Sequence, residues 1–426
     1  MVDENLLTEQ PADLAWLFLD LNAYFASVEQ QEHPELRNRP VAVVPVLADS
    51  SSVIAASYEA KRFGIRCGTQ IGEAKERCPD ITLISGRAGK YVEYHHRILE
   101  AVETVLPIDK VCSIDEMRFH LLRSERDPER VTKLAQELKS TLKTKIGECI
   151  RCSIGVAPNP FLAKLATEMQ KPDGLVLLRK QDLPHALHKV ALTDFPGVNR
   201  RMRARLNAAG IFDTAALCAA DRRDLAVAFG SIIGERWWYL LRGIDVREPE
   251  VARHTLSHSH VLPPELRTDE GCRRVILRLM QKAAARLRAN GLWTSSVTFW
   301  VKAKRPWESH VRVPATQDTV ALTETFHQVW EARDFHRPLA VGVVFADLRQ
   351  AAQVTPSLFD QVEERSAFNS AVDDLNRRFG KHAVYLADIE SVRHTAQEKI
   401  AFQKTWLFSE GKGDHDQFPQ PPRPSA

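Results

Sequence analysis

Three acidic residues stand at positions where carboxylates could bind metal ions and support chemistry. Asp20 directly follows the apolar run of residues 14–19, and Asp115 and Glu116 are adjacent within the sequence Cys-Ser-Ile-Asp-Glu. Carboxylates that are brought together repel one another and are tolerated mainly where divalent cations neutralise them. Two magnesium ions held in this way could align a nucleophilic oxygen with a leaving pyrophosphate. The alternative is that each acid is a solvated strand end, which for Asp20 alone would be the favoured interpretation.

The first 170 residues predict an α+β layer that positions these acids. Residues 14–19 read as a buried strand that ends at Asp20, and Asn22 is placed to cap the following helix. Adjacent Asp115 and Glu116 point to opposite faces of a strand, so the use of both requires a bend or the end of the sheet. The other expected strands are 40–46, 53–56, 81–84, 111–121 and 150–157, and the expected helices are 57–63, 92–105, 131–146 and 161–170. This order favours a sheet with helices on one face.

The second half of the chain predicts a helical segment followed by another α+β unit. Residues 192–243 read as helical, and residues 247–260 read as a linker. The expected elements beyond the linker are helix 272–287, strand 295–301, helix 320–330, strand 339–345 and helix 365–379. The proline-rich end, residues 418–426, predicts disorder.

Length and composition exclude several classes of protein. A chain of 426 residues with 44% hydrophobic content predicts two to four domains with substantial cores. No run of about 18 apolar residues is present, and the acidic N-terminus does not resemble a secretion signal, so we expect a cytoplasmic protein without a membrane partner. The 58 Lys and Arg residues against 55 Asp and Glu give a net charge of +3, which by itself indicates no nucleic-acid partner.

Seven scattered cysteines give no clear metal or disulfide framework. Cys149 and Cys152 form a CxxC sequence, but no second pair and no histidine cluster completes a zinc site. Both residues lie in a predicted strand, which favours packing in the core over a metal or redox function.

Four sequence segments occur in an order that is typical of one family. They are residues 17–29 (LFLDLNAYFASVE), 53–65 (VIAASYEAKRFGI), 113–116 (SIDE) and 153–159 (SIGVAPN), the last with LAK at 162–164 and KPDG at 171–174. In this order they resemble the Y-family translesion DNA polymerases, and most closely the bacterial DNA polymerase IV branch. The resemblance covers about residues 14–390, and four ordered motifs are far more specific than any one of them.

The resemblance implies a fold and a metal site. The fold would be α+β: a right-hand polymerase with a ferredoxin-like palm, small fingers, a helical thumb and a separate α+β little finger. Asp20 and Asp115 would bridge two Mg²⁺ ions, and Glu116 would complete the catalytic-metal site. The carbonyl of Leu21 would be a ligand of the nucleotide-bound metal.

The resemblance also implies a nucleotide site. Phe25 would be the steric gate, because a flat ring there leaves room for a 2′-hydrogen but not for a 2′-hydroxyl. The alternative is a core aromatic residue, a role that Tyr24 could fill instead. Tyr58, Lys61 and Lys171 would bind the triphosphate through a phenol and two ammonium groups. From the residues alone, Lys171 would read as a favourable cation at a helix C-terminus, which is compatible with that function.

Several positions depart from the family's usual pattern. Asn22 stands where a second Asp is frequent, and Ala55 stands where a phosphate-binding Thr is common. Lys61 replaces a frequent Arg and would give a point charge rather than a bidentate contact. Residues 117–120, Met-Arg-Phe-His, replace the usual Ala-Tyr-Leu-Asp and are expected to alter the packing beneath the active site. These departures leave all three acids in place.

DNA contacts are expected outside the catalytic layer. Residues 195–206 resemble a helix-hairpin-helix, whose turn amides bind backbone phosphates, with a solvated helix face as the alternative. Asn199 stands there where a second Gly is usual, and Asn tolerates a positive φ. The expected DNA-binding residues are Gly197, Asn199, Arg200 and Arg201 in this segment and Lys302, Lys304 and Arg305 in the little finger. A weak sliding-clamp motif includes Leu358 and Phe359, although its expected Gln is displaced to Gln353.

The expected domains follow from these motifs. They are the first palm strand (12–22), fingers (23–86), palm (87–176), thumb (177–246), linker (247–260), little finger (261–388) and a partly disordered tail (389–426). We therefore expect a monomeric DNA-directed DNA polymerase that takes primer-template DNA and deoxynucleoside triphosphates and copies damaged templates with low fidelity, in DNA damage tolerance and repair. The alternative is a catalytically weak polymerase-like adaptor that binds DNA and recruits partners at the sliding clamp. Retention of Asp20, Asp115 and Glu116 favours the enzyme.

Overall fold

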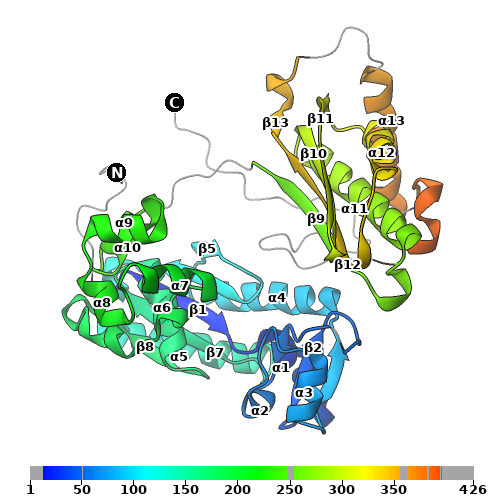
Figure 1. Cartoon of the computed structure of the whole chain (residues 1–426). Helices are drawn as coiled ribbons and strands as arrows, with labels where there is room; N and C mark the ends of the chain where they lie inside the picture. The colour runs from blue at the N-terminus through cyan, green and yellow to red at the C-terminus, as the bar shows by residue number, and fades with distance from the viewer. Residues whose placement is uncertain are drawn as a thin grey trace. The chain divides into compact units, whose positions relative to one another are not determined.

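A computed structural model describes residues 13–49, 51–247, 254–355, 362–380, 383–393 and 395. The chain forms two compact units, one within residues 1–250 and one that begins after residue 250 (Figure 1). No helix among the residues described is both long and apolar enough to cross a membrane.

The central sheet of the first unit has the strand order β5-β6-β1-β7-β8. Its strands are β1 (Trp16–Leu21), β5 (Lys110–Val111), β6 (Glu116–His120), β7 (Cys152–Ala157) and β8 (Leu175–Leu177). Leu17 and Leu19 alternate with Phe18 and Asp20, so one face is apolar and fully buried while the other carries the first acid. Helix α6 (Pro160–Met169) crosses the face that carries the acid, where a side chain at Gly155 would collide with its backbone.

Two further helices accompany this sheet. Helix α4 (Ala88–Glu103) packs on α5 (Pro128–Lys145), and α5 contacts β7 and β8. The amphipathic pattern expected over 131–146 is confirmed, with Asp127 as N-cap and Leu134, Leu138 and Leu142 buried. The predicted N-cap at Asn159 is also confirmed: its side chain accepts a hydrogen bond from the amide of Leu162 at 2.9 Å.

The segment between β1 and α4 contains a small second sheet with the strand order β3-β2-β4. It contains β2 (Val41–Val44), β3 (Ala55–Ala56) and β4 (Thr82–Ser85), with α1 (Tyr24–Glu32), α2 (Tyr58–Lys61) and α3 (Ile71–Arg77) around it. Its core is small and made of Ala, Val and Ile side chains together with Cys78. The side chain of Ser57 caps α2 by accepting from the amide of Ala60, which fixes where this short helix begins.

The helical segment expected over 192–243 is confirmed. It contains α7 (Arg200–Ala208), α8 (Thr214–Ala219), α9 (Arg222–Phe229) and α10 (Ile232–Leu240). Trp237 and Leu206 pack in one core with Leu162 and Leu165 of α6. The Asn159 amide also donates to the carbonyls of Leu240 and Ile244, and the indole of Trp16 donates to Asp245. These bonds tie the helical segment to the sheet.

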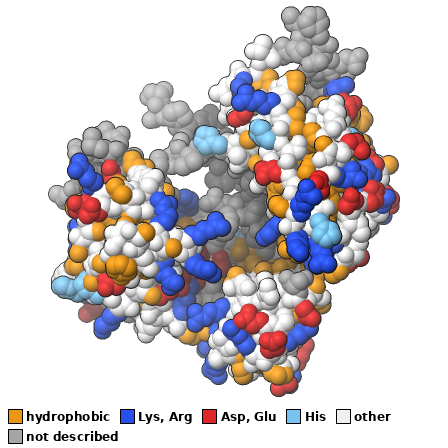
Figure 2. Space-filling view, in the orientation of Figure 1, with side chains coloured by type: hydrophobic (Ala, Val, Ile, Leu, Met, Phe, Trp, Pro, Cys, Tyr) orange, Lys and Arg blue, Asp and Glu red, His pale blue; other side chains and the backbone are white. Residues whose placement is uncertain are grey.

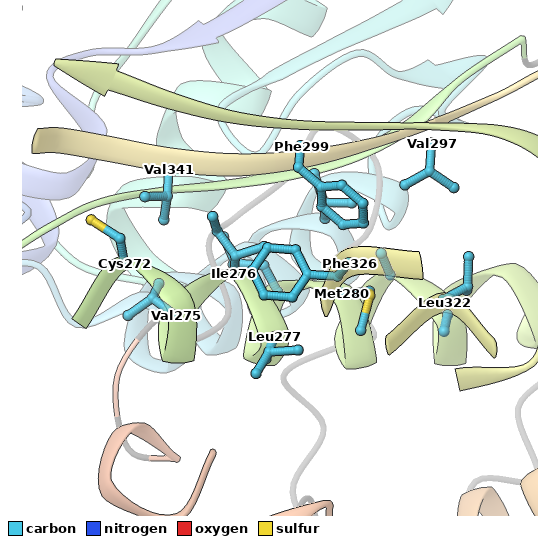
Figure 3. Close-up of a cluster of buried hydrophobic side chains, with 14 of the residues drawn as sticks. Cys272, Val275, Ile276, Leu277, Met280, Val297, Phe299, Leu322, Phe326 and Val341 are labelled. Atoms are coloured by element: carbon cyan, nitrogen blue, oxygen red, sulfur yellow. The ribbon is translucent and has the colours of Figure 1, made fainter. Parts of the chain in front are cut away.

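The second unit is a five-stranded antiparallel sheet with helices on one face; four strands follow the order β11-β10-β12-β9, and the short β13 pairs with β10. Its elements are β9 (Leu256–Val261), α11 (Asp269–Ala289), β10 (Leu292–Arg305), β11 (Trp307–Thr316), α12 (Thr319–Trp330), β12 (His336–Ala346), β13 (Arg349–Gln350) and α13 (Val362–Phe379). Figure 3 shows Phe299 of the sheet and Phe326 of α12 directed toward each other in the core, with ring centroids 5.0 Å apart. On the other face of the sheet, the ring of Trp300 lies across Gly342 of β12, where no side chain could fit.

Three expectations for this half of the chain are corrected. Residues 256–260, read as part of a linker, belong to β9, an edge strand paired with β12. A second edge strand, β11, was not anticipated. Ile389 and Val392, expected in the tail, are buried in the core of this unit.

Candidate active site

The three acids of the first unit meet at one end of the central sheet. Asp20, the second-last residue of β1, lies opposite Glu116, the first residue of β6. Residues 113–115 form a bend between β5 and β6, so the structure contains the bend that adjacent acids require. The hydroxyl of Ser113 donates to Asp115 at 2.5 Å, and the amide of Leu21 donates to the Asp115 carbonyl at 2.9 Å. The bend is therefore anchored on both sides.

The acids are buried enough to perturb one another. Asp20 is only 5% exposed. Burial raises the pKa of Asp115 above its ordinary value, and the nearby charge of Asp20 raises it further. Burial also raises the pKa of Glu116, with Asp20 and Asp115 adding to the effect. Burial and neighbouring carboxylates thus disfavour the charged forms of Asp115 and Glu116, and a nearby cation would favour them.

Two lysines lie among these carboxylates. The ammonium of Lys164, on α6, contacts Asp20 and lies 2.8 Å from Glu116. The ammonium of Lys171 lies 2.8 Å from Asp20 and 2.8 Å from Glu168. Burial acts to lower the pKa of Lys164, but the carboxylates around it, Asp20 first, raise it above the ordinary value. Lys164 therefore remains an ammonium.

Helix α2 brings two more predicted residues to the same place. The Lys61 ammonium lies 4.1 Å from the centre of the Tyr58 ring. Burial, with the charges of Asp20 and Glu168, raises the pKa of Tyr58 to about 12. Burial and the charge of Lys171 lower the pKa of Lys61. Tyr58, Lys61 and Lys171 consequently converge beside Asp20, as a triphosphate site would require.

The predicted gate residue rests on an ordered support. Phe25 is partly exposed and stacks on Tyr91 of α4, with centroids 4.4 Å apart and planes 13° apart. The Tyr91 hydroxyl donates to Glu29 at 2.7 Å, and Arg87 donates to both oxygens of that fully buried carboxylate. Tyr24 is the buried aromatic of the pair, with its hydroxyl bonded to the Tyr91 carbonyl.

Asn22 has a different role from the predicted helix cap. Ala23, in the left-handed region at φ 49°, precedes α1, and no side chain caps the helix. The Asn22 amide instead donates to the hydroxyl of Ser153 at 3.0 Å and accepts from the amide of Asp173 at 2.7 Å. Asn22 thereby joins β1, β7 and the turn that follows Lys171. The Asn at this position is a structural link at the edge of the site.

Sequence reasoning missed residues that support the acids from behind. His95 of α4 is buried, and its Nδ1 donates to the carbonyl of Ile114, the residue before Asp115. Burial lowers the pKa of His95 to about 4. Glu168 accepts from two lysines. The spacing of Lys164, Glu168 and Lys171 on and just after one helix was a usable signal, whereas nothing local in the sequence marked His95.

The donor set has the chemistry of a divalent-cation site. Among the described residues, no cluster of three or more His, Cys, Asp and Glu side chains forms a ready-made metal centre. At the sheet end, the ammonium of Lys164 lies between Asp20 and Glu116. The carboxylate oxygens of Asp20, Asp115 and Glu116 are nevertheless of the kind that suits Mg²⁺, and burial raises the pKa of Asp115 and of Glu116. The chemical type of these side chains fits the ion, and the assignments of Asp20, Leu21, Asp115 and Glu116 as its ligands stay predictions.

The altered segment after the acids divides between the two faces of its strand. Met117 and Phe119 are fully buried on the apolar face. Arg118 and His120 lie on the same face as Glu116, where Arg118 pairs with Asp109 at 2.7 Å and His120 packs against Trp16. The departure therefore changes the open face beside the site as well as the packing beneath it.

The predicted DNA-binding residues lie on exposed surfaces. Gly197 has φ +92°, whereas Asn199 has φ −84° and caps α7 by accepting from the amide of Met202, so the expected positive φ at Asn199 is wrong. Arg200 and Arg201 open this helix and are exposed. In the second unit, Lys302, Lys304 and Arg305 are exposed, and Arg305 pairs with Asp334 at 2.5 Å. Figure 2 shows Lys and Arg side chains on the visible face of both units.

Two minor expectations have simple outcomes. Cys149 and Cys152 are not joined by a disulfide, and Cys152 is buried in β7, in agreement with core packing. The weak clamp motif at Leu358 and Phe359 lies outside the residues that the structure describes.

Family models match both units. Residues 19–168 match the impB/mucB/samB family, and residues 253–358 match the impB/mucB/samB family C-terminal domain. The sequence is 32% identical to a DNA polymerase IV of Moorella thermoacetica over 392 residues, which cover 88% of this chain and 96% of that protein. It is 29% identical to a DNA polymerase IV of Pelotomaculum thermopropionicum, covering 87% and 94%.

A solved structure has the same fold. The Y-family DNA polymerase chimera Dbh-Dpo4(243-245)-Dbh aligns with a TM-score of 0.66 and 21% identity. The alignment covers 79% of this chain and all of that one. The right-hand α+β architecture expected from the sequence is thereby confirmed.

Proposed function

This chain belongs to the Y family of DNA polymerases and is a DNA-directed DNA polymerase, and on that premise we propose that it copies damaged templates by a two-metal mechanism. It would add deoxynucleotides to a primer 3′ end, with low fidelity and low processivity. The observation that carries the proposal is the convergence of Asp20, Asp115 and Glu116 with Tyr58, Lys61 and Lys171 at one sheet end.

Asp20, Asp115 and Glu116 would hold the cations, with the carbonyl of Leu21 as a further oxygen ligand. When bound, two Mg²⁺ ions supply charge neutralisation and alignment for attack of a primer 3′-oxygen on an α-phosphate. The fixed bend at Asp115, anchored by Ser113, keeps the acids at the sheet end without reorganisation.

Tyr58, Lys61 and Lys171 would bind the triphosphate. Lys171 already contacts Glu168 and Asp20, and Lys61 lies over the Tyr58 ring, so their ammonium groups are held near the site before a nucleotide arrives. Two ammonium groups offset the charge that builds on a leaving pyrophosphate. The phenol of Tyr58, whose pKa is raised to about 12, remains a hydrogen-bond donor at neutral pH.

Phe25 would select deoxynucleotides. Its ring is held flat against Tyr91, and the bonds of Tyr91 to buried Glu29 restrict any retreat from a sugar 2′-hydroxyl. The small, partly exposed side chain of Ala55 in β3 leaves little to enclose a nascent base pair, which supports a permissive site, whereas Ala56 is buried in the core of the small sheet.

Extension of a labelled primer with Mg²⁺ tests the proposal. The intact chain should extend the primer and Asp115→Ala should not, while Asp80→Ala, at an exposed loop residue, should match the intact chain. Equal inertness of the intact chain and Asp115→Ala at saturating nucleotide would favour the adaptor function instead. A template with an abasic site should be traversed; a stop there as sharp as that of a high-fidelity polymerase would count against translesion synthesis.

The gate is tested by competition between ribonucleotides and deoxynucleotides. Phe25→Ala should raise ribonucleotide incorporation by about 10²-fold or more, because the variant lacks the ring that would clash with a 2′-hydroxyl. An unchanged ratio would remove Phe25 from the nucleotide site.

A further inference from the structure

We propose that Lys164 and a divalent cation compete for the carboxylates of Asp20 and Glu116, and that Glu168 is the alternative acceptor to which Lys164 moves when the cation binds. Lys164 and Glu168 would then be positioning residues that set the cation affinity of the site. The inference rests on the proposed function, since it takes Asp20, Asp115 and Glu116 as the cation-binding acids.

The position of the Lys164 ammonium carries the first step. It contacts Asp20, lies 2.8 Å from Glu116 and lies 3.1 Å from Glu168. The side chain is only 17% exposed, so the ammonium has little water to replace these acceptors. An ammonium has three donors, and here three carboxylates accept them. Lys164 therefore uses oxygens on the same two acids that a cation would need.

Electrostatic repulsion prevents the Lys164 ammonium and a divalent cation from occupying the site together. A divalent cation bound by Asp20 and Glu116 would repel an ammonium held a few ångströms away, so the two would not both stay in place. Removal of the ammonium from both acids is therefore the expected response. An ammonium buried without a partner would itself be costly.

Glu168 gives the displaced Lys164 ammonium a partner, so the ammonium is not left buried and unpaired. It lies one helical turn after Lys164 on α6, so it moves with the same rigid element and stays within reach. Its carboxylate is 32% exposed and already accepts from Lys171 at 2.8 Å. Lys164 can thus leave Asp20 and Glu116 through a side-chain rotation while it remains paired.

The two residues must then act in opposite directions. The cluster holds four carboxylates, Asp20, Asp115, Glu116 and Glu168, against three ammonium groups, Lys61, Lys164 and Lys171. Loss of the Lys164 charge removes the competitor and should tighten cation binding. Loss of the Glu168 charge leaves Lys164 without a charged alternative acceptor and should weaken cation binding. A merely structural role for these residues would give weakening in both cases.

Direct binding of Mn²⁺ to the full chain, without DNA or nucleotide, tests the proposal. Electron paramagnetic resonance of free Mn²⁺ gives the Kd independently of catalysis. Lys164→Met should lower the Kd by about tenfold, and Glu168→Gln should raise it by about tenfold, since residues around metal ligands typically change affinity by this much. Glu137→Gln, at an exposed glutamate of α5, is the matched control and should bind as the intact chain does.

Two further variants separate the possible failures. If Asp115→Asn abolishes Mn²⁺ binding while Lys164→Met and Glu168→Gln both bind like the intact chain, the competition is overturned and the cation site stands. If Asp115→Asn binds Mn²⁺ normally, the proposed cation site itself fails. Circular dichroism checks folding; should Lys164→Met not fold, Glu168→Gln decides alone, because an unchanged or lowered Kd overturns the proposal.

Discussion

The two units place their charged residues in opposite ways. At the sheet end of the first unit, acids and lysines are packed together below the surface, and burial shifts the pKa values of Asp115 and Glu116. On the second unit, Lys302 and Lys304 stand exposed on a sheet whose other face covers an apolar core. In the first unit, burial of charged groups lowers the stability of the fold but brings them together for chemistry. In the second unit, the apolar core stabilises the fold and the charged groups lie on the surface. Substitution of a buried charged residue in the first unit should therefore abolish activity, whereas substitution of an exposed charged residue in the second unit should weaken DNA binding only in part.

The largest expected effect comes from Asp115→Asn. Primer extension should fall by at least about 10³-fold, because the variant lacks a carboxylate at the centre of the cation site. Stability should hold or rise by about 1 kcal/mol, because the raised pKa of Asp115 means that its charged form is disfavoured in the fold. Calorimetry of the intact and variant chains measures this. A large loss of stability would show that Asp115 has a structural role and break the contrast between the units.

A substitution in the core of the second unit should lower stability. Phe326→Ala removes a buried ring that packs on Phe299 and should destabilise this unit by about 3–5 kcal/mol. A calorimetric transition of the second unit should move while that of the first stays in place. Phe368→Ala, at an exposed phenylalanine of α13, is the control and should change little. Equal shifts of both transitions would mean that the units do not unfold separately.

A buried histidine should give the first unit a pH-dependent stability. His95 has a pKa of about 4 in the fold against 6.5 for the free side chain, so the unfolded chain takes up its proton first as the pH falls. The free energy of unfolding should therefore decrease between about pH 6.5 and pH 4, by up to roughly 3 kcal/mol from this group.

His95→Gln should remove that part of the pH dependence. His96→Gln, at an exposed neighbour, should retain it. Urea unfolding of the first unit at several pH values gives the slopes. Identical slopes for the intact chain and His95→Gln would show that the histidine is not buried in its neutral form.

The smallest effect concerns the exposed lysines. Lys302→Ala should reduce the salt dependence of primer-template binding by about one phosphate contact, a slope change of roughly 0.9. Arg305→Ala should change the slope less, because Arg305 already pairs with Asp334. Fluorescence anisotropy at several salt concentrations measures both. A greater effect of Arg305 would show that the ion pair opens on DNA.

Much of the fold and the core of the site could be predicted from the sequence. Adjacent Asp115 and Glu116 require a bend, and the structure has one; Asn159 caps the helix that its position indicates. The placement of Tyr58, Lys61 and Lys171 came only through family resemblance, because residues about 110 positions apart carry no local signal of contact.

The misses have physical causes. β9 (Leu256–Val261) and β11 (Trp307–Thr316) are edge strands with one solvated face, so polar residues alternate along them and weaken the apolar pattern. Asn22 was assigned to a cap because of its residue type, but its amide is used across strands. His95 contacts the bend before Asp115 only through tertiary packing, and the periodicity of the sequence does not reveal such contacts.

The contact between Trp300 and Gly342 constrains how these two positions can change in evolution. These residues face each other on neighbouring strands, and the indole occupies the volume that any other side chain at position 342 would need. A lineage that replaced Gly342 would first have to acquire a smaller residue at position 300. Among homologues the two sites should therefore change in a fixed order, and a bulky pair should be missing from their sequences.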